Sequence, residues 1–146
     1  MLTYFGIWMS GSSGTSIENC YFVTQDYDEC IKLGTEMLTG FVTSGPDDDQ
    51  RVQILGIDLN KKQFKKLLDC VDNPDWEFLC DCYYDGTEVI EFDYSDRDEF
   101  YYTSGGGFED EEPDYDNPRY EDPNWEEEVK YYVEQKIKMR LNDFEL

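Results

Sequence analysis

Apolar and polar positions along the first half of the chain predict three strands. Apolar and aromatic residues are dense over Leu2–Met9 and Asn19–Val23, and the polar stretch Ser10–Ser16 between them predicts a hairpin connection. A further apolar run, almost unbroken, covers Val52–Asp58. We therefore expect these three segments to form part of one sheet.

Helical spacing and capping signals predict two helices in the same half. The first begins at Asp26, with Glu29 in the capping-box position, and ends at Gly40. The second begins at Asn60, with Gln63 three residues later. The positions expected to face the core are Tyr27, Cys30, Ile31, Gly34, Met37 and Leu38 in the first helix, and Phe64, Leu67, Leu68 and Val71 in the second. The lysines of the second helix, Lys61, Lys62, Lys65 and Lys66, are interpreted as its solvated face.

Alternation predicts a β-hairpin made of Trp76–Tyr84 and Thr87–Tyr94. A two-residue turn at Asp85-Gly86 would set Cys80 opposite Glu91, whereas a three-residue loop pairs apolar residues with one another. We expect the three-residue loop, and Glu99–Thr103 as a candidate further strand. The outward face of this hairpin would then carry Glu77, Asp81, Glu91 and Asp93.

A long amphipathic helix is expected at the end of the chain. Asn124 and Glu127 form a third capping box, and helical spacing continues to about Phe144. The expected buried stripe is Trp125, Val129, Tyr132, Val133, Ile137, Leu141 and Phe144. The 146 residues are predicted to form one α+β domain, a mostly antiparallel sheet packed by about three helices. Its parts are a body at 1–103, an acidic segment rich in proline and aromatic residues at 104–123, and the helix at 124–146.

Negative charge is concentrated in one part of the chain. The whole sequence has 35 acidic and 12 basic residues and no histidine. Residues 69–128 hold 23 of the acidic residues and only two arginines, while residues 1–68 hold nine acidic and six basic residues. A field of this strength excludes binding to nucleic acid and to anionic membranes, and it attracts cationic surfaces.

Three proline-led pentads, PDYDN, PRYED and PNWEE, occupy residues 113–127. Proline fixes φ, so acidic side chains recur at regular steps in an extended segment. Two functions are considered for this segment: a surface of defined shape that a partner recognises, or a set of charges that only keeps the domain soluble. Trp125 is expected to face inward because it starts the helical stripe, and the orientation of Tyr115 and Tyr120 stays open.

Catalytic and metal-binding chemistry is poorly supplied. The five cysteines show no C-x-x-C pair, and without histidine the usual general base is missing, so we expect no enzyme, no cofactor and no metal site. Cys80 and Cys82 are interpreted as core residues. Two calcium-like loops fail at the fifth ligand, where Arg97 and Pro118 stand. With neither a signal peptide nor a transmembrane segment in the sequence, a cytoplasmic protein is expected.

Two segments near the start resemble the opening of ArdA-type anti-restriction proteins. They are YFGIW (Tyr4–Trp8) and CYFVTQDYDE (Cys20–Glu29). In charge and size the chain also resembles the acidic DNA-mimic inhibitors of phages and mobile elements, which include anti-CRISPR and anti-restriction proteins. The resemblance implies a non-enzymatic inhibitor that blocks the cationic nucleic-acid channel of a CRISPR effector or restriction enzyme.

Two other functions are consistent with the same composition. One is an immunity protein that neutralises a basic nuclease toxin, and the other is an acidic chaperone or adaptor of basic proteins. In each case the partner is a cationic protein. The residues predicted to bind it are Glu77, Asp81, Glu91, Asp93, Asp96, Asp98, Glu99, Glu109, Asp110, Glu111, Glu112, Asp114, Asp116, Glu121 and Asp122.

Overall fold

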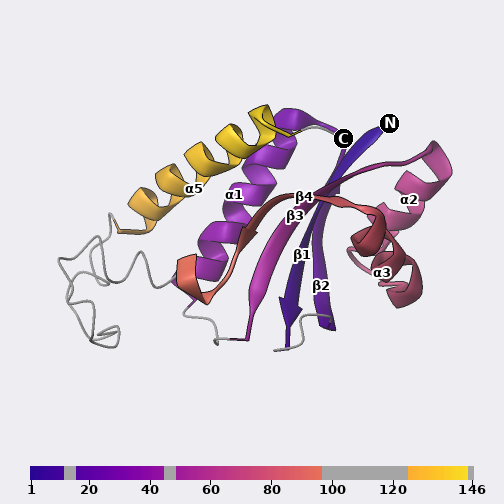
Figure 1. The fold of residues 1–146 in the computed structure, drawn as a ribbon, viewed down its shortest axis with the longest axis horizontal. Helices are drawn as coiled ribbons and strands as arrows, with labels where there is room; N and C mark the ends of the chain where they lie inside the picture. Colours follow the sequence, from indigo (N-terminus) through magenta and orange to yellow (C-terminus); the bar gives the residue numbers. More distant parts are fainter. Residues whose placement is uncertain (12–15, 45–48, 97–124, 145–146) are drawn as a thin grey trace.

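A four-stranded antiparallel sheet organises the chain (Figure 1). This computed structural model describes residues 1–11, 16–44, 49–96 and 125–144. The strands lie in the order β2-β1-β3-β4, and every neighbouring pair is antiparallel. The α+β class with a mostly antiparallel sheet is thereby confirmed. The strands are β1 (Leu2–Ser10), β2 (Ser16–Thr24), β3 (Arg51–Asp58) and β4 (Thr87–Phe92).

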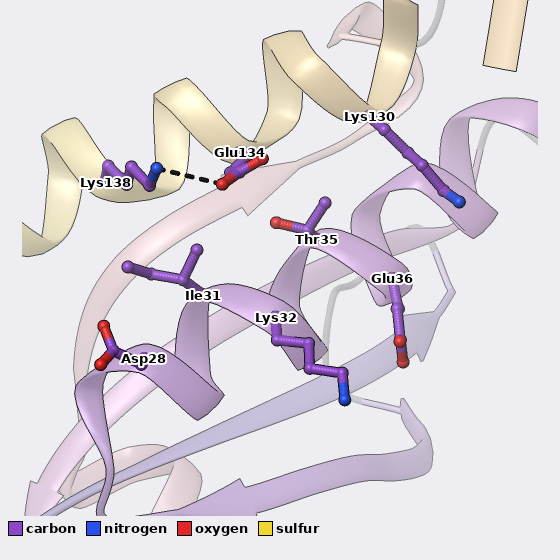
Figure 2. Close-up of a pocket in the computed structure, with 8 residues that line it drawn as sticks. All are labelled: Asp28, Ile31, Lys32, Thr35, Glu36, Lys130, Glu134 and Lys138. Atoms are coloured by element: carbon purple, nitrogen blue, oxygen red, sulfur yellow. Dashed lines mark ion pairs between the residues drawn. The ribbon is translucent and has the colours of Figure 1, made fainter. Parts of the chain in front are cut away.

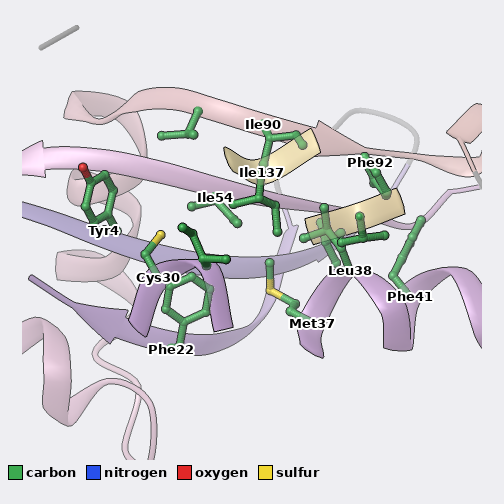
Figure 3. Close-up of a cluster of buried hydrophobic side chains, with 14 of the residues drawn as sticks. Tyr4, Phe22, Cys30, Met37, Leu38, Phe41, Ile54, Ile90, Phe92 and Ile137 are labelled. Atoms are coloured by element: carbon green, nitrogen blue, oxygen red, sulfur yellow. The ribbon is translucent and has the colours of Figure 1, made fainter. Parts of the chain in front are cut away.

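Helices α1 (Tyr27–Thr43) and α5 (Trp125–Asn142) cover one face of the sheet. Their apolar stripes meet side chains from all four strands, and Figure 3 shows Leu38 of α1 and Ile137 of α5 packed near Ile54 of β3. The stripe predicted for the C-terminal helix is confirmed over its described part, since Val129, Val133, Ile137 and Leu141 are buried and Tyr132 and Phe144 pack against the cluster.

Helices α2 (Lys61–Asp69) and α3 (Trp76–Asp85) cover the opposite face, so the sheet lies between two helical layers (Figure 1). Along β1, Tyr4 belongs to the first core, whereas Phe5 and Ile7 belong to the second and are fully buried. Leu79 of α3 also joins this second core with no exposed surface. Both faces of β1 are therefore lined with apolar side chains that need a cover.

The predicted hairpin at 76–94 is wrong, because its first half is the helix α3. Asp75 caps this helix by accepting a hydrogen bond from the backbone N–H of Phe78 at 3.2 Å. Leu79 and Cys82 are three residues apart and both buried, which is helical spacing. The second half, β4, pairs with β3 instead. The shared outward face of Glu77, Asp81, Glu91 and Asp93 therefore does not exist, and the expected three helices omitted α3.

Three smaller predictions about the helices are also wrong. Tyr27, expected to face the core, is 40% exposed at the first turn of α1. Helix α1 continues past Gly40 to Thr43, because Phe41 and Val42 are fully buried in the first core and hold the last turn. Leu68 is 43% exposed, since α2 turns only the side that carries Leu67 fully into the second core. The capping box at Asn60 and Gln63 is confirmed, with both reciprocal hydrogen bonds present at 2.8 and 3.0 Å.

Several predictions lie outside the described residues. These are the candidate strand Glu99–Thr103, the acidic segment 104–123 with its pentads, the cap at Asn124 and the side chain of Trp125. No helix in the described ranges is both long and apolar enough to cross a membrane.

Both edge strands contain register shifts. In β2, Tyr21 has no partner in β1, because Gly6 pairs with Phe22 and Ile7 pairs with Cys20. Glu18 has no partner either, because Trp8 pairs with Asn19 and Met9 pairs with Ile17. In β4, Val89 is left over between the residues that pair with Ile54 and Leu55. Such β-bulges bend an edge and discourage the addition of another strand.

Four of the five cysteines are buried, and the fifth, Cys80, is partly exposed. Burial raises the pKa of the Cys20 and Cys30 thiols to about 12 and that of Cys82 to about 11. A thiol with so high a pKa stays protonated and unreactive near neutral pH. Cys82 is a core residue, as expected, and Cys80 packs against the second core.

The close approach of β1 and α1 generates a testable prediction at Gly6. A Cβ there would lie 2.4 Å from the Phe22 ring and 2.9 Å from the sulfur of Met37. We expect Gly6→Ala to lower the free energy of unfolding by about 1–3 kcal/mol through overpacking. Gly40→Ala is the matched control, because no atom lies within 4 Å of its Cβ and it should stabilise α1 by up to about 1 kcal/mol. Chemical denaturation followed by circular dichroism checks both, and equal effects at the two sites would contradict the packing argument.

Candidate functional site

The structure describes five of the fifteen acidic residues predicted to bind a partner. Glu77 and Asp81 lie on α3, Glu91 lies on β4, and Asp93 and Asp96 follow β4. The other ten lie outside the described residues: Asp98, Glu99, Glu109, Asp110, Glu111, Glu112, Asp114, Asp116, Glu121 and Asp122.

Helix α3 presents a row of carboxylates, Glu77, Asp81 and Asp85, hereafter the α3 acidic row. All three residues are exposed and follow one another at intervals of four, which is about 6 Å along a helix. Sequence analysis missed Asp85, because it was placed in a turn. None of the three forms an ion pair with another described residue. Like charges at this spacing destabilise a helix by about 0.2–0.5 kcal/mol per pair, so the row carries a folding cost.

Two aromatic side chains on α3 flank the acidic row. Trp76 is 49% exposed and Tyr84 is 69% exposed, although both are large apolar groups. The Tyr84 ring contacts only Tyr83 among the described aromatic residues, edge to face at 5.3 Å. Exposed tryptophan and tyrosine beside charged groups are typical of protein interfaces.

The surroundings of α3 do little to neutralise it. The sequence has neither lysine nor arginine from residue 67 to residue 96. Lys66 of α2 is the nearest cation in sequence, and its ammonium lies 3.6 Å from Asp75 and 4.6 Å from the centre of the Phe78 ring. Lys66 therefore compensates the N-cap carboxylate of α3 and forms no ion pair with the acidic row.

The predicted binding residues after α3 have local structural partners instead. Glu91 forms an ion pair with Arg51 of the neighbouring strand at 3.3 Å. Asp93 accepts a hydrogen bond from the backbone N–H of Ser95 at 2.8 Å, and its own N–H donates to the Asp96 carboxylate at 2.9 Å. These bonds fix the turn that follows β4. Glu91 and Asp96 lie close to α5, whereas α3 covers the face of the sheet opposite α5, so these residues do not join the α3 acidic row.

A cavity of about 190 Å³ lies between β4 and α5. It brings Glu91 and Asp96 together with three residues that sequence reasoning missed, Glu88, Lys136 and Arg140. Burial raises the pKa of Glu88, and the nearby Glu91 carboxylate raises it further. Burial is also the main reason why the pKa of Asp96 is raised. Helical spacing of Lys136 and Arg140 would have placed them on one side of the last helix, but nothing in the sequence paired that side with β4.

A larger groove of about 430 Å³ separates α1 and α5 (Figure 2). Its charged side chains are balanced, because three lysines face three carboxylates, and Lys138 forms an ion pair with Glu134 at 3.0 Å. The hydroxyl of Thr35 is buried beside it with no hydrogen-bond partner among the described residues. The groove thus differs from α3, where charge of one sign is left unbalanced. Its charged lining residues are Asp28, Lys32, Glu36, Lys130, Glu134 and Lys138.

Within the described ranges, no three potential metal ligands of the histidine, cysteine, aspartate and glutamate types come together at metal-binding distance. The chain was also compared with known proteins. No family model, no curated protein and no solved structure matches it. The site is therefore argued from its own geometry.

The raised pKa of Glu88 gives a prediction about stability and pH. Because the pKa of Glu88 is higher in the folded chain than in the unfolded chain, protonation of this carboxyl stabilises the fold. This stabilisation is fully present below the ordinary pKa of glutamate and is lost as the pH rises through the pKa of Glu88 in the folded chain. We expect Glu88→Gln to raise the free energy of unfolding at pH 7, by less than about 1 kcal/mol because the carboxyl is screened by solvent. The gain should disappear as the pH falls to about 4.

Urea denaturation between pH 4 and pH 7 measures this difference. Glu36→Gln on the exposed side of α1 is the control, because it removes one negative charge at a site outside the cavity. If both variants gain the same stability at pH 7, the effect belongs to net charge and not to the surroundings of Glu88.

Proposed function

We propose that this protein is a non-enzymatic acidic inhibitor that occupies the cationic nucleic-acid-binding channel of a bacterial defence nuclease, a CRISPR effector or a restriction enzyme. The observation that carries the proposal is the α3 acidic row, Glu77, Asp81 and Asp85, which is exposed and lacks an ion-pair partner in the described part of the chain. The row replaces the hairpin face that the sequence predicted.

The spacing and rigidity of the row support this function. A helix holds its carboxylates at fixed steps of about 6 Å, so a partner that normally binds successive phosphates meets negative charges in a regular line. Trp76 and Tyr84 add aromatic faces beside the charges, and nucleic-acid channels commonly contain groups that stack on bases. Helix α3 is held by Leu79 and Cys82 in the second core, so the row is preorganised.

The folding cost of the row also supports a binding role. Three like charges at intervals of four residues destabilise α3, and a neighbouring lysine or arginine would remove that cost. The sequence has none between residues 67 and 96. Solubility alone needs less charge than this chain has, because a net charge of about 2–8 is enough for a small domain and this one carries −23.

A basic nuclease toxin is a second candidate target. The exposed Trp76 and Tyr84 favour it, because an immunity protein recognises its toxin by shape and apolar contact as well as by charge. The two targets are distinguished by identifying the captured protein.

Capture from the lysate of a bacterium that carries CRISPR and restriction systems tests the proposal. We expect the immobilised protein to retain a basic nuclease that duplex DNA displaces, with affinity falling steeply as the salt concentration rises. The variant Glu77→Gln, Asp81→Asn, Asp85→Asn should bind at least about tenfold more weakly, a change of 1.4 kcal/mol. DNA competition and affinity are then measured with the captured nuclease after it has been purified.

The matched control is Asp28→Asn, Glu36→Gln, Asp143→Asn, which removes the same charge from exposed positions outside α3. This variant should bind within about twofold of the wild type. A retained partner that DNA does not displace, or equal losses in the two variants, would contradict occupancy of the channel by α3.

A further inference from the structure

Helices α2 and α3 place opposite charges side by side on one surface of the molecule. The two helices lie next to each other over the second face of the sheet (Figure 1). Lys66 of α2 reaches Asp75 and the Phe78 ring of α3, so the lysine side of α2 borders α3. One surface therefore carries a row of lysines beside the α3 acidic row.

Two of the three lysines on this side of α2 lack an ion-pair partner among the described residues. Lys62, Lys65 and Lys66 point away from the side of α2 that carries the buried Leu67, and all three are exposed. Lys62 and Lys65 form no ion pair with any described residue. Unpaired charges of opposite sign, Lys62 and Lys65 on α2 and the acidic row on α3, therefore lie on neighbouring helices, and like charges on each helix destabilise it.

We propose that a second copy of this chain binds this surface, forming a two-fold symmetric dimer through α2 and α3. A two-fold axis between the helices brings the lysine row of one copy onto the acidic row of the other, and the same contact repeats on the opposite side of the axis. Each row then gains the charges that it lacks in the monomer, and the interface is complementary to itself.

Apolar contact is available within the same surface. Tyr84 lies on α3 three residues after Asp81 and is 69% exposed. An aromatic side chain at that place is desolvated when the second copy covers it, which is the usual core of an interface. Repulsion between the acidic residues elsewhere in the two copies is screened beyond about 8 Å at physiological ionic strength.

Other surfaces of the described chain are less suited to binding a second copy. Both sheet edges are bulged, which discourages strand pairing with a second copy. The groove between α1 and α5 mixes lysines and carboxylates along both helices, so it offers no separate row of either sign. The α2/α3 surface differs from this groove because its lysines lie on one helix and its unpaired carboxylates on the other.

The dimer does not depend on the proposed inhibitory function. It does share the α3 acidic row with that function, so self-association and binding of a cationic partner would exclude each other. Dimerisation is tested with the purified protein alone, and its failure therefore leaves the nuclease experiment untouched.

Sedimentation velocity with two charge-reversed variants tests the dimer. The monomer mass is 17.3 kDa. The apparent mass of the wild type should rise from the monomer value to twice that value as its concentration rises from about 1 to 200 μM. Lys62→Glu with Lys65→Glu, and separately Glu77→Lys with Asp81→Lys, should each weaken association at least about tenfold, because each variant opposes like charges across the axis. An equimolar mixture of the two variants should associate again, since every opposed row is then complementary.

Lys32→Glu with Lys130→Glu is the matched control, because it reverses two lysines at the α1/α5 groove. This control should dimerise like the wild type, and circular dichroism should show that every variant is folded. A wild type that stays monomeric up to the highest concentration overturns the proposal. Folded variants that remain monomeric when mixed also overturn it, because the dimer would then not be formed by these rows.

Discussion

Burial of β1 and β3 on both faces is the constraint on which the rest of the structure depends. Phe5 and Ile7 point to one side of the sheet, and Tyr4, together with Ile54 of β3, points to the other. A strand that is apolar on both faces destabilises the sheet unless each face is covered, since every exposed side chain of this size forgoes about 1.5–3 kcal/mol of burial. Two helical layers provide this cover, and the position of the α3 acidic row follows from them.

The same constraint explains why residues 76–85 form a helix although they alternate like a strand. Trp76, Phe78, Cys80 and Cys82 are separated by polar or acidic positions except at Leu79, so a period of two fits the segment nearly as well as a helical period. The local signal that favours the helix is Asp75, which follows Pro74 and caps the third residue. Leu79 decides between the two, because a helix buries it beside Cys82 whereas the hairpin would have turned it outward with the acids.

The sequence was sufficient for features that depend on local chemistry. The strands of the first half, the capping box at Asn60 and the stripe that includes Val133 and Ile137 all follow from periodicity and side-chain hydrogen bonds. Features that depend on contacts between elements distant in the chain could not be predicted from the sequence. Glu88 meets Arg140 only because β4 is an edge strand beside α5, and no local pattern contains that information. The acidic row was found in part, through Glu77 and Asp81, but on the wrong type of element.

The distribution of thiols has a practical consequence for following α3 in solution. Four cysteines are buried, namely Cys20, Cys30, Cys70 and Cys82. Cys80 is partly exposed on the helix that carries the acidic row. A maleimide dye or a spin label therefore attaches to the native chain at one position without any engineered cysteine. Cys80 of the wild-type protein is thus an attachment point for a spectroscopic label, about one helical turn from Glu77 and Tyr84.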